Sequence, residues 1–165
     1  RRELKSQPTG QAHIVLIFLF VDYNFMKFDL SKLEISVFDK RKEIIFPNEL
    51  SVELAELIGI LVGDGHLSVL KRIGPTGKIF TQSTIFVSGN SNEKEYLGYI
   101  QNLFLTLFNT HLTSRKDKRS DAILLVCYSK GIVNYLSKVC QIPVGKKCAT
   151  VRIPRIIFDS NDCKN

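Results

Sequence analysis

The sequence has few of the features on which zinc-bound, disulfide-built or membrane-spanning proteins depend. Its four cysteines, at positions 127, 140, 148 and 163, form no C-x-x-C pair, so we expect reduced thiols and neither a zinc site nor a disulfide scaffold. The most apolar run, Ile14 to Val21, is eight residues long, whereas a membrane-spanning helix needs about 20 residues. We find no secretory signal with a small-residue cleavage site. We therefore expect a cytoplasmic, organellar or nucleoid-associated protein that is not secreted and has no membrane partner.

The chain carries a net positive charge. Lysine and arginine number 23 against 16 acidic residues, which gives a net charge of +7 and a pI near 9.3. This balance favours a polyanionic partner, most simply nucleic acid, although an indifferent basic surface gives the same count. The 165 residues, 44% of them hydrophobic and 24% charged, suffice for one globular domain with a core.

From residue 51 onward the pattern alternates helices with pairs of strands. Ser51 is a suitable N-cap, and apolar residues at helical spacing, Leu54, Leu57, Ile58 and Leu61, predict a helix that ends at Gly63 and Gly65. Strand pairs follow around "GPTG" and around the basic turn 114–121. A second helix lies within 92–109, with an expected apolar face of Tyr96, Tyr99, Ile100, Leu103 and Leu107. A short third helix covers 131–140.

The order α-β-β-α-β-β-α predicts an α+β fold. We expect a four-stranded antiparallel, saddle-like sheet with the helices on one face and the other face open. Residues 1–45 are patterned weakly, and we interpret them as a poorly defined N-terminal extension of a domain that covers 46–165. Within the extension we expect a turn at 39–43 and a short strand at 43–46.

The first helix has small residues where a core helix would have large ones. Ala55, Gly59 and Gly63 recur every four residues and so form one stripe. Each helical glycine costs about 1 kcal/mol relative to alanine. The stripe would offset this cost by letting a second helix approach closely, or it would make room for a large core neighbour. We leave both interpretations open.

Asp64 follows this stripe at the C-terminal end of the helix, where the helix dipole disfavours a carboxylate. Two helices packed along such stripes would bring two such acids together, and like charges that close need a cation between them. Carboxylates and water are the ligands that Mg²⁺ prefers. The pattern therefore predicts half of a two-fold seam that ends in a metal site.

The stretch "LIGILVGDG", Leu57 to Gly65, resembles the motif of the LAGLIDADG homing endonucleases. Leu57, Gly59, Asp64 and Gly65 match the motif, whereas Ile58 and Val62 depart from its alanine and its first aspartate. The resemblance covers about Phe46 to Phe158, and it includes the order of the elements and the tail "GKK…VRIPRIIF". The first forty or so residues lie outside it.

This resemblance implies a site-specific endonuclease for intron homing that hydrolyses double-stranded DNA with a divalent metal. It implies that Asp64 binds Mg²⁺ or Mn²⁺ with help from the carbonyl of Gly63, and that Ca²⁺ is a non-catalytic substitute. It places Lys146, or failing that Lys147, near the scissile phosphate. A residue in the region Ser88 to Asn90 would orient the attacking water.

The second strand would read DNA, since a two-stranded ribbon fits the major groove. By alternation Gln82, Thr84, Phe86 and Ser88 share one face, with Ile85 and Val87 on the other, and Ser68 and Arg72 share a side of the first strand. Phe86 is a misfit there, so it contacts a thymine methyl or the assignment is off by one residue. We expect contacts with DNA phosphates from Lys71, Arg115, Lys116, Lys118, Arg119 and Lys130. For the basic turn, the alternative is a loop that is only solvated.

A single motif leaves the assembly open. The chain is a homodimer subunit that pairs through helix 51–63 and binds a near-palindromic site, or it is the first half of a two-motif enzyme. A non-cleaving binder of the same fold, either an RNA-splicing maturase or a DNA-binding regulator, is the main alternative function. A protein-interaction module that uses the glycine seam is a third.

Overall fold

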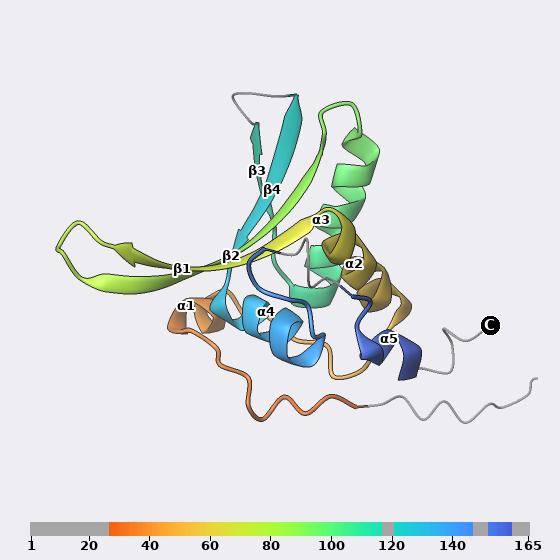
Figure 1. The fold of residues 1–165 in the computed structure, drawn as a ribbon, viewed down its shortest axis with the longest axis horizontal. Helices are drawn as coiled ribbons and strands as arrows, with labels where there is room; N and C mark the ends of the chain where they lie inside the picture. The colour runs from red at the N-terminus through yellow and green to blue at the C-terminus, as the bar shows by residue number, and fades with distance from the viewer. Residues whose placement is uncertain (1–26, 117–120, 147–151, 160–165) are drawn as a thin grey trace, which may run out of the picture.

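The computed structural model describes residues 27–116, 121–146 and 152–159 of the chain. A four-stranded sheet carries helices on one side (Figure 1). The elements are α1 (Val37–Arg41), α2 (Val52–Gly63), β1 (Gly65–Ile73), β2 (Ile79–Asn90), α3 (Lys94–Phe108), β3 (Thr113–Lys116), β4 (Ala122–Tyr128), α4 (Lys130–Asn134), its π-helical continuation η1 (Tyr135–Val139) and α5 (Arg155–Asp159). From α2 to α4 this is the predicted α-β-β-α-β-β-α order, so the predicted fold class is confirmed.

All strand pairs of the sheet are antiparallel, and the strand order is β1-β2-β4-β3. The β1–β2 hairpin is the longest pairing, and its outer half extends past the helices (Figure 1). The predicted turn between β1 and β2 forms at residues 74–78, where Gly77 has φ of +75°, a conformation that favours glycine. The hairpin is therefore a ribbon exposed to solvent on both faces at its outer end.

Alternation along the strands divides the sheet into two faces. The face under the helices contributes Leu67, Ile85, Val87, Leu125 and Cys127 to the core. We call the other side the open face, because α2, α3 and α4 all pack on the first side. Register assigns to the open face His66, Ser68, Leu70 and Arg72 of β1, Phe80, Gln82, Thr84, Phe86 and Ser88 of β2, Leu124, Val126 and Tyr128 of β4, and Thr113 and Arg115 of β3.

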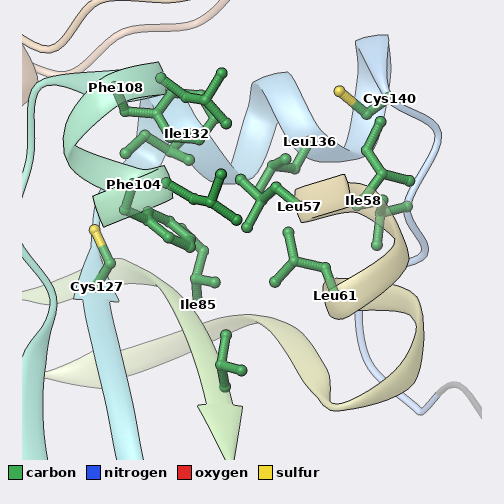
Figure 2. Packing of buried hydrophobic residues seen from close by; sticks show 14 of the residues in the cluster. Leu57, Ile58, Leu61, Ile85, Phe104, Phe108, Cys127, Ile132, Leu136 and Cys140 are labelled. Atoms are coloured by element: carbon green, nitrogen blue, oxygen red, sulfur yellow. The ribbon is translucent and has the colours of Figure 1, made fainter. Parts of the chain in front are cut away.

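The core lies between the sheet and the three main helices (Figure 2). The four predicted core residues of α2, Leu54, Leu57, Ile58 and Leu61, are all buried, and Ser51 caps the helix by accepting from the Leu54 N–H at 3.2 Å. Each such side chain contributes about 1.5–3 kcal/mol through its burial.

The expected apolar face of α3 was partly wrong. Tyr99 is 41% exposed and Tyr96 is half-buried, whereas Leu97, Phe104 and Phe108 complete the buried side. The helix is rotated about its axis relative to the prediction, so that both phenol hydroxyls contact acids at α2 and do not point into the core.

Residues 27–46, most of which the sequence analysis set apart, pack against the domain core. The ring of Phe28 meets Tyr135 edge to face at 6.3 Å, and the ring of Phe46 meets Phe108 at 6.5 Å. The strand expected at 43–46 is absent from this described segment, and the expected turn at 39–43 contains the end of α1. A reciprocal capping box between Ser36 and Asp39 explains why a helix starts there.

Asp39 connects this N-terminal segment to the start of α4. Its buried carboxylate accepts from the N–H and the Oγ of Ser36, at 2.9 and 2.6 Å, and from the Gly131 N–H at 2.9 Å. Burial raises the pKa of Asp39, but hydrogen bonds from Ser36, Ser129 and Gly131 outweigh burial and hold the pKa below its ordinary value. Gly131 must be glycine, since a Cβ there would lie 2.7 Å from Cζ of Phe46.

Two of the four cysteines lie in the described residues, and both are buried and free of disulfides. Burial raises the pKa of Cys127 to about 11 and that of Cys140 to about 12. Both therefore remain thiols at neutral pH. Cys148, Cys163 and the apolar run Ile14 to Val21 lie outside the described residues. Within those residues, no helix is both long and apolar enough to cross a membrane.

Candidate functional site

The site begins where α2 ends. Asp64 is the C-cap of α2, its N–H donates to the Ile60 carbonyl at 2.8 Å, and its carboxylate is exposed. β1 starts at the next residue, Gly65, where a Cβ would lie 2.6 Å from Cα of Leu61. Glycine therefore lets the chain leave the helix at once, which fixes Asp64 at the junction between the helical layer and the sheet.

The small-residue stripe of α2 is an open surface of this chain. Gly59 and Gly63 are exposed, and an added Cβ at either would meet no described atom within 4 Å. Ala55 is half-buried. Because no atom of the described residues lies in front of either glycine, the alternative that they make room for a core neighbour is not supported. The stripe is accessible to a second helix and leads directly to Asp64.

Two further predicted residues come close to Asp64. The Ser88 N–H donates to the Asp64 carbonyl at 3.3 Å, so the end of β2 is tied to the end of α2. Val144 bridges Leu67 in parallel fashion, and the Gly145 N–H donates to the Leu67 carbonyl at 2.8 Å. Lys146 follows this bond directly, and Leu67 lies about 10 Å from Asp64 along the strand. Lys147 lies outside the described residues.

The region expected to orient water contains one exposed hydroxyl, that of Ser88. Asn90 is occupied by the turn before α3, since its Oδ1 accepts from the Asn92 N–H at 3.0 Å and its own N–H donates to Oε2 of Glu93 at 2.7 Å. A Cβ at Gly89 would lie 2.8 Å from Cδ2 of Leu97, so a larger residue there would require the Leu97 side chain to move. The geometry therefore favours Ser88 over its two neighbours.

The register confirms the predicted faces of the first hairpin. Ser68 lies opposite Thr84, and His66 opposite Phe86, so these residues share the open face with Gln82, Ser88 and Arg72. A face assignment shifted by one residue is excluded. Phe86 is less of a misfit than expected, because its half-buried ring stacks on His66 with centroids 6.2 Å apart.

The residues of the open face differ in how much surface they offer. Thr84 and Ser68 are only 3% and 8% exposed, so their larger neighbours cover them. Arg72 is exposed and Gln82 half-buried further along the hairpin. Beside them lie Leu70 and Phe80, 48% and 49% exposed, which sequence reasoning missed because apolar residues were not expected on this side.

The predicted phosphate contacts divide between the two faces. Arg115 lies on the open face with its guanidinium 5.7 Å from the ring centroid of Tyr128. Val126, which lies between Phe86 and Thr113 on this face, is only 1% exposed. Lys71 and Lys116 lie on the face of the sheet opposite the open face. Nζ of Lys116 lies 4.0 Å from Oδ1 of Asp121, and both side chains are exposed. Lys118 and Arg119 lie outside the described residues.

Lys130, predicted as a phosphate contact, lies in the helical layer and not on the open face. It is the first residue of α4 in the helical layer, and its Nζ lies 2.9 Å from a carboxylate oxygen of Glu34. Lys138 contacts the same carboxylate at 3.0 Å. The bond from Lys130, with that from Lys138, lowers the pKa of Glu34 to about 2. Lys130 therefore drops out of the proposed DNA contacts.

Two tyrosines of α3 lie beside acids of α2, which the sequence did not reveal. The Tyr96 hydroxyl donates to Oδ2 of Asp64 at 3.5 Å, and the Tyr99 hydroxyl donates to Oε2 of Glu56. Burial, then the Asp64 charge, raises the pKa of Tyr96, so this phenol stays protonated. The only signal in the sequence was their i, i+3 spacing, which equally fits an apolar face.

The oxygen ligands at Asp64 are of the kind that a hard divalent cation binds, but one chain supplies too few of them to fill its coordination shell. A carboxylate and the Gly63 carbonyl are oxygen ligands of the kind that Mg²⁺ takes. Within the described residues, no group of three or more histidine, cysteine or acidic side chains could hold a metal ion. A second Asp64 across the stripe, together with water, would complete the ligand set.

Sequence comparison finds little. No protein-family model matches the sequence. A DNA polymerase from Methanocaldococcus jannaschii is 38% identical over 94 residues, which make up 53% of this chain and 6% of the polymerase. The chain thus spans a small part of that relative.

Comparison with solved structures finds likeness to parts of homing endonucleases. I-TnaI is 17% identical with a TM-score of 0.40, over 56% of this chain and 60% of that chain. The I-SmaMI LAGLIDADG homing endonuclease bound to cleaved DNA is 16% identical with a TM-score of 0.40, over 51% and 29%. The group I intron-encoded I-CeuI complexed with DNA is 19% identical with a TM-score of 0.42, over 66% and 52%. All three of these proteins are homing endonucleases. The motif that Leu57 to Gly65 resembles is named after the same class of protein.

Proposed function

We propose that this chain is half of a metal-dependent endonuclease that acts on double-stranded DNA. The observation that carries the proposal is the position of Asp64, an exposed carboxylate at the end of an open small-residue stripe, with the Ser88 N–H bonded to its carbonyl. The segment before Lys146 is bonded to Leu67, on the strand that follows Asp64. The resemblance of Leu57 to Gly65 to the LAGLIDADG motif supports the same function. The second half is a second copy that pairs through residues 51–63, or another chain segment with the same motif.

The residues at this junction supply the groups that phosphodiester hydrolysis needs. Asp64 and the Gly63 carbonyl would hold Mg²⁺ or Mn²⁺, which when bound supplies an activated water and charge against the phosphoryl oxygens. Lys146 brings a positive charge to the phosphate. Ser88 has an exposed hydroxyl beside Asp64 that can hold the attacking water by a hydrogen bond.

The open face would lie in the major groove. On the hairpin, Arg72 is exposed and Gln82 is half-buried. An arginine side chain can pair with the base edge of G, and a glutamine side chain with that of A. Arg115 would contact phosphate, as would Lys118 and Arg119 of the basic turn. Lys71 of β1 and Lys116 of β3 lie on the side of the sheet that faces away from the open face, and they would reach the DNA backbone only from the edges of the sheet.

The test is selection of cleaved sites from a random duplex library with Mg²⁺ at known protein concentration. A homodimer predicts a near-palindromic product consensus, because an isologous dimer presents the same surface twice. Salt-sensitive binding without cutting, under Mg²⁺ and Mn²⁺ alike, would contradict the enzyme and favour the non-cleaving binder.

Gly59→Met should abolish self-association without unfolding the chain. The added side chain enters open space in the single chain but fills the gap into which a second helix would pack. The helix itself should gain up to about 1 kcal/mol, because glycine is a poor helix former. Sedimentation velocity would measure assembly, and thermal unfolding would measure stability.

Gly98→Met is the matched control for this experiment. Gly98 is also exposed within a helix and has no described atom within 4 Å of an added Cβ, but it lies on α3 and is not part of the stripe. It should gain similar stability and keep its assembly. If Gly59→Met and Gly98→Met assemble like the unaltered chain, α2 is not the seam.

Arg72→Ala should weaken binding to a selected DNA site by about tenfold or more, the effect of losing one bidentate base contact. Lys130→Ala should change affinity by less than about twofold, because its ammonium pairs with Glu34 in the helical layer. Fluorescence anisotropy at one fixed salt concentration would measure both. Equal losses in the two variants would show that the open face has no special part in binding.

A further inference from the structure

We propose that Tyr96 is a positioning residue that orients the Asp64 carboxylate for a divalent cation. The inference rests on the proposed metal site at Asp64. The Tyr96 hydroxyl donates to Oδ2 of Asp64 at 3.5 Å, across a separation of 32 residues in sequence. Donation to one carboxylate oxygen leaves Oδ1 available to a cation and limits rotation of the group.

The surroundings of the two residues explain why such a donor is useful. Asp64 is exposed at the C-terminal end of α2, where the helix dipole repels a carboxylate, so its side chain would otherwise turn towards solvent. Tyr96 is half-buried and its ring packs against the edge of the core, which fixes the direction of its hydroxyl. The phenol is neutral and therefore adds a hydrogen bond without competing for the cation.

The same arrangement occurs about two turns earlier on α2, which provides an internal comparison. Tyr99 donates to Glu56, and Glu56 precedes Asp64 by two helical turns. Tyr99 and Tyr96 are on one helix and each donates to an acid of α2, but only Tyr96 contacts the acid at the end of the stripe. Tyr99→Phe is thus the matched control for Tyr96→Phe.

Terbium luminescence tests whether Tyr96 lies at the cation. The chain has five tyrosines and no tryptophan, so Tb³⁺ emission excited through the protein reports on nearby tyrosines. Tb³⁺ is a hard cation that takes oxygen ligands, and energy transfer to it falls steeply with distance. We expect emission from the unaltered chain, loss in Asp64→Asn, loss of most emission in Tyr96→Phe, and little change in Tyr99→Phe.

Mn²⁺ affinity, measured from the free-ion signal in electron paramagnetic resonance, tests the positioning role itself. Tyr96→Phe should bind Mn²⁺ about tenfold more weakly, the usual effect of removing a group that orients a metal ligand, with the unfolding temperature unchanged. Tyr99→Phe should bind Mn²⁺ as the unaltered chain does. A merely structural role for Tyr96 would lower stability without this selective loss of affinity.

The possible outcomes separate this inference from the proposed function. If Asp64→Asn loses Mn²⁺ and Tyr96→Phe does not, the positioning role is wrong and the metal site stands. If Tyr96→Phe and Tyr99→Phe weaken Mn²⁺ binding equally, the effect belongs to the helix and the inference is again overturned. If Asp64→Asn binds Mn²⁺ like the unaltered chain, the metal site is wrong and the inference is overturned with it.

Discussion

Asp64→Asn should lower cleavage of double-stranded DNA by about a thousandfold or more, because it removes the proposed metal-binding carboxylate at the end of the stripe. The asparagine keeps the shape of the side chain and the C-cap geometry, so the fold should persist. DNA affinity should stay within about threefold, since phosphate and base contacts come from other residues. Plasmid nicking and cutting with Mg²⁺ and Mn²⁺ would measure cleavage, and anisotropy in Ca²⁺ would measure binding.

Asp29→Asn is the matched control for Asp64→Asn. Asp29 is exposed in the N-terminal segment, where its carboxylate accepts from Ser31, and it should have no effect on cleavage or affinity. Cleavage that survives in Asp64→Asn would refute the proposed catalytic site. An unaltered chain that binds and never cuts, even with a second motif-bearing half supplied, would identify a binder instead.

Asp39→Ala should lower the free energy of unfolding by about 2–3 kcal/mol, because it leaves the half-buried donors of Ser36 and the buried N–H of Gly131 without their acceptor and removes the capping box of α1. That loss corresponds to a fall in unfolding temperature of roughly 5–10 °C for a chain of this size. Asp29→Ala, which removes an exposed carboxylate, should change stability by less than about 0.5 kcal/mol. Similar losses in both variants would show that burial of Asp39 is unimportant.

The Asp39 contribution should also depend on pH in a defined direction. Because hydrogen bonds hold the folded pKa of Asp39 below its ordinary value, its contribution is fully present above the unfolded pKa of about 3.9. It is lost as pH falls from there through the folded pKa. The difference in stability between the unaltered chain and Asp39→Ala should therefore shrink below about pH 4. Urea unfolding at pH 7 and at pH 3 would measure it, and a difference that grows on acidification would contradict the assignment.

Local rules were sufficient for much of the fold. Ser51 and Gly63 bound α2 as expected, since capping and helix termination depend on residues within one turn. The faces of β2 followed from alternation of Ile85 and Val87 with polar neighbours, and the turn at 74–78 followed from glycine and proline. The small-residue stripe that ends at Asp64 already predicted a metal site there, whereas the predicted role of Lys146 came only from the resemblance to a known motif.

Contacts between residues far apart in sequence were beyond prediction. Asp39 and Gly131 are 92 residues apart, and nothing near either marks the pairing. Lys130 looked like an available cation because Glu34, 96 positions earlier, belonged to a segment with little pattern. The tyrosines of α3 fit an apolar face by spacing alone, and only the orientation of the helix shows that their hydroxyls reach acids.

The two edge strands of the sheet determine whether copies of this protein can associate by adding strand to strand. Exposed strand borders invite further strands, and natural sheets protect them by cover, brevity or charge. At one margin, Val144 and Gly145 cover the inner part of β1, while at the other β3 is only four residues long and carries Arg115 and Lys116. Addition of a further strand is therefore opposed at β3 and along the inner part of β1. In the proposed dimer the small-residue stripe of α2 packs against the same stripe of a second copy, and such a contact is complete with two partners.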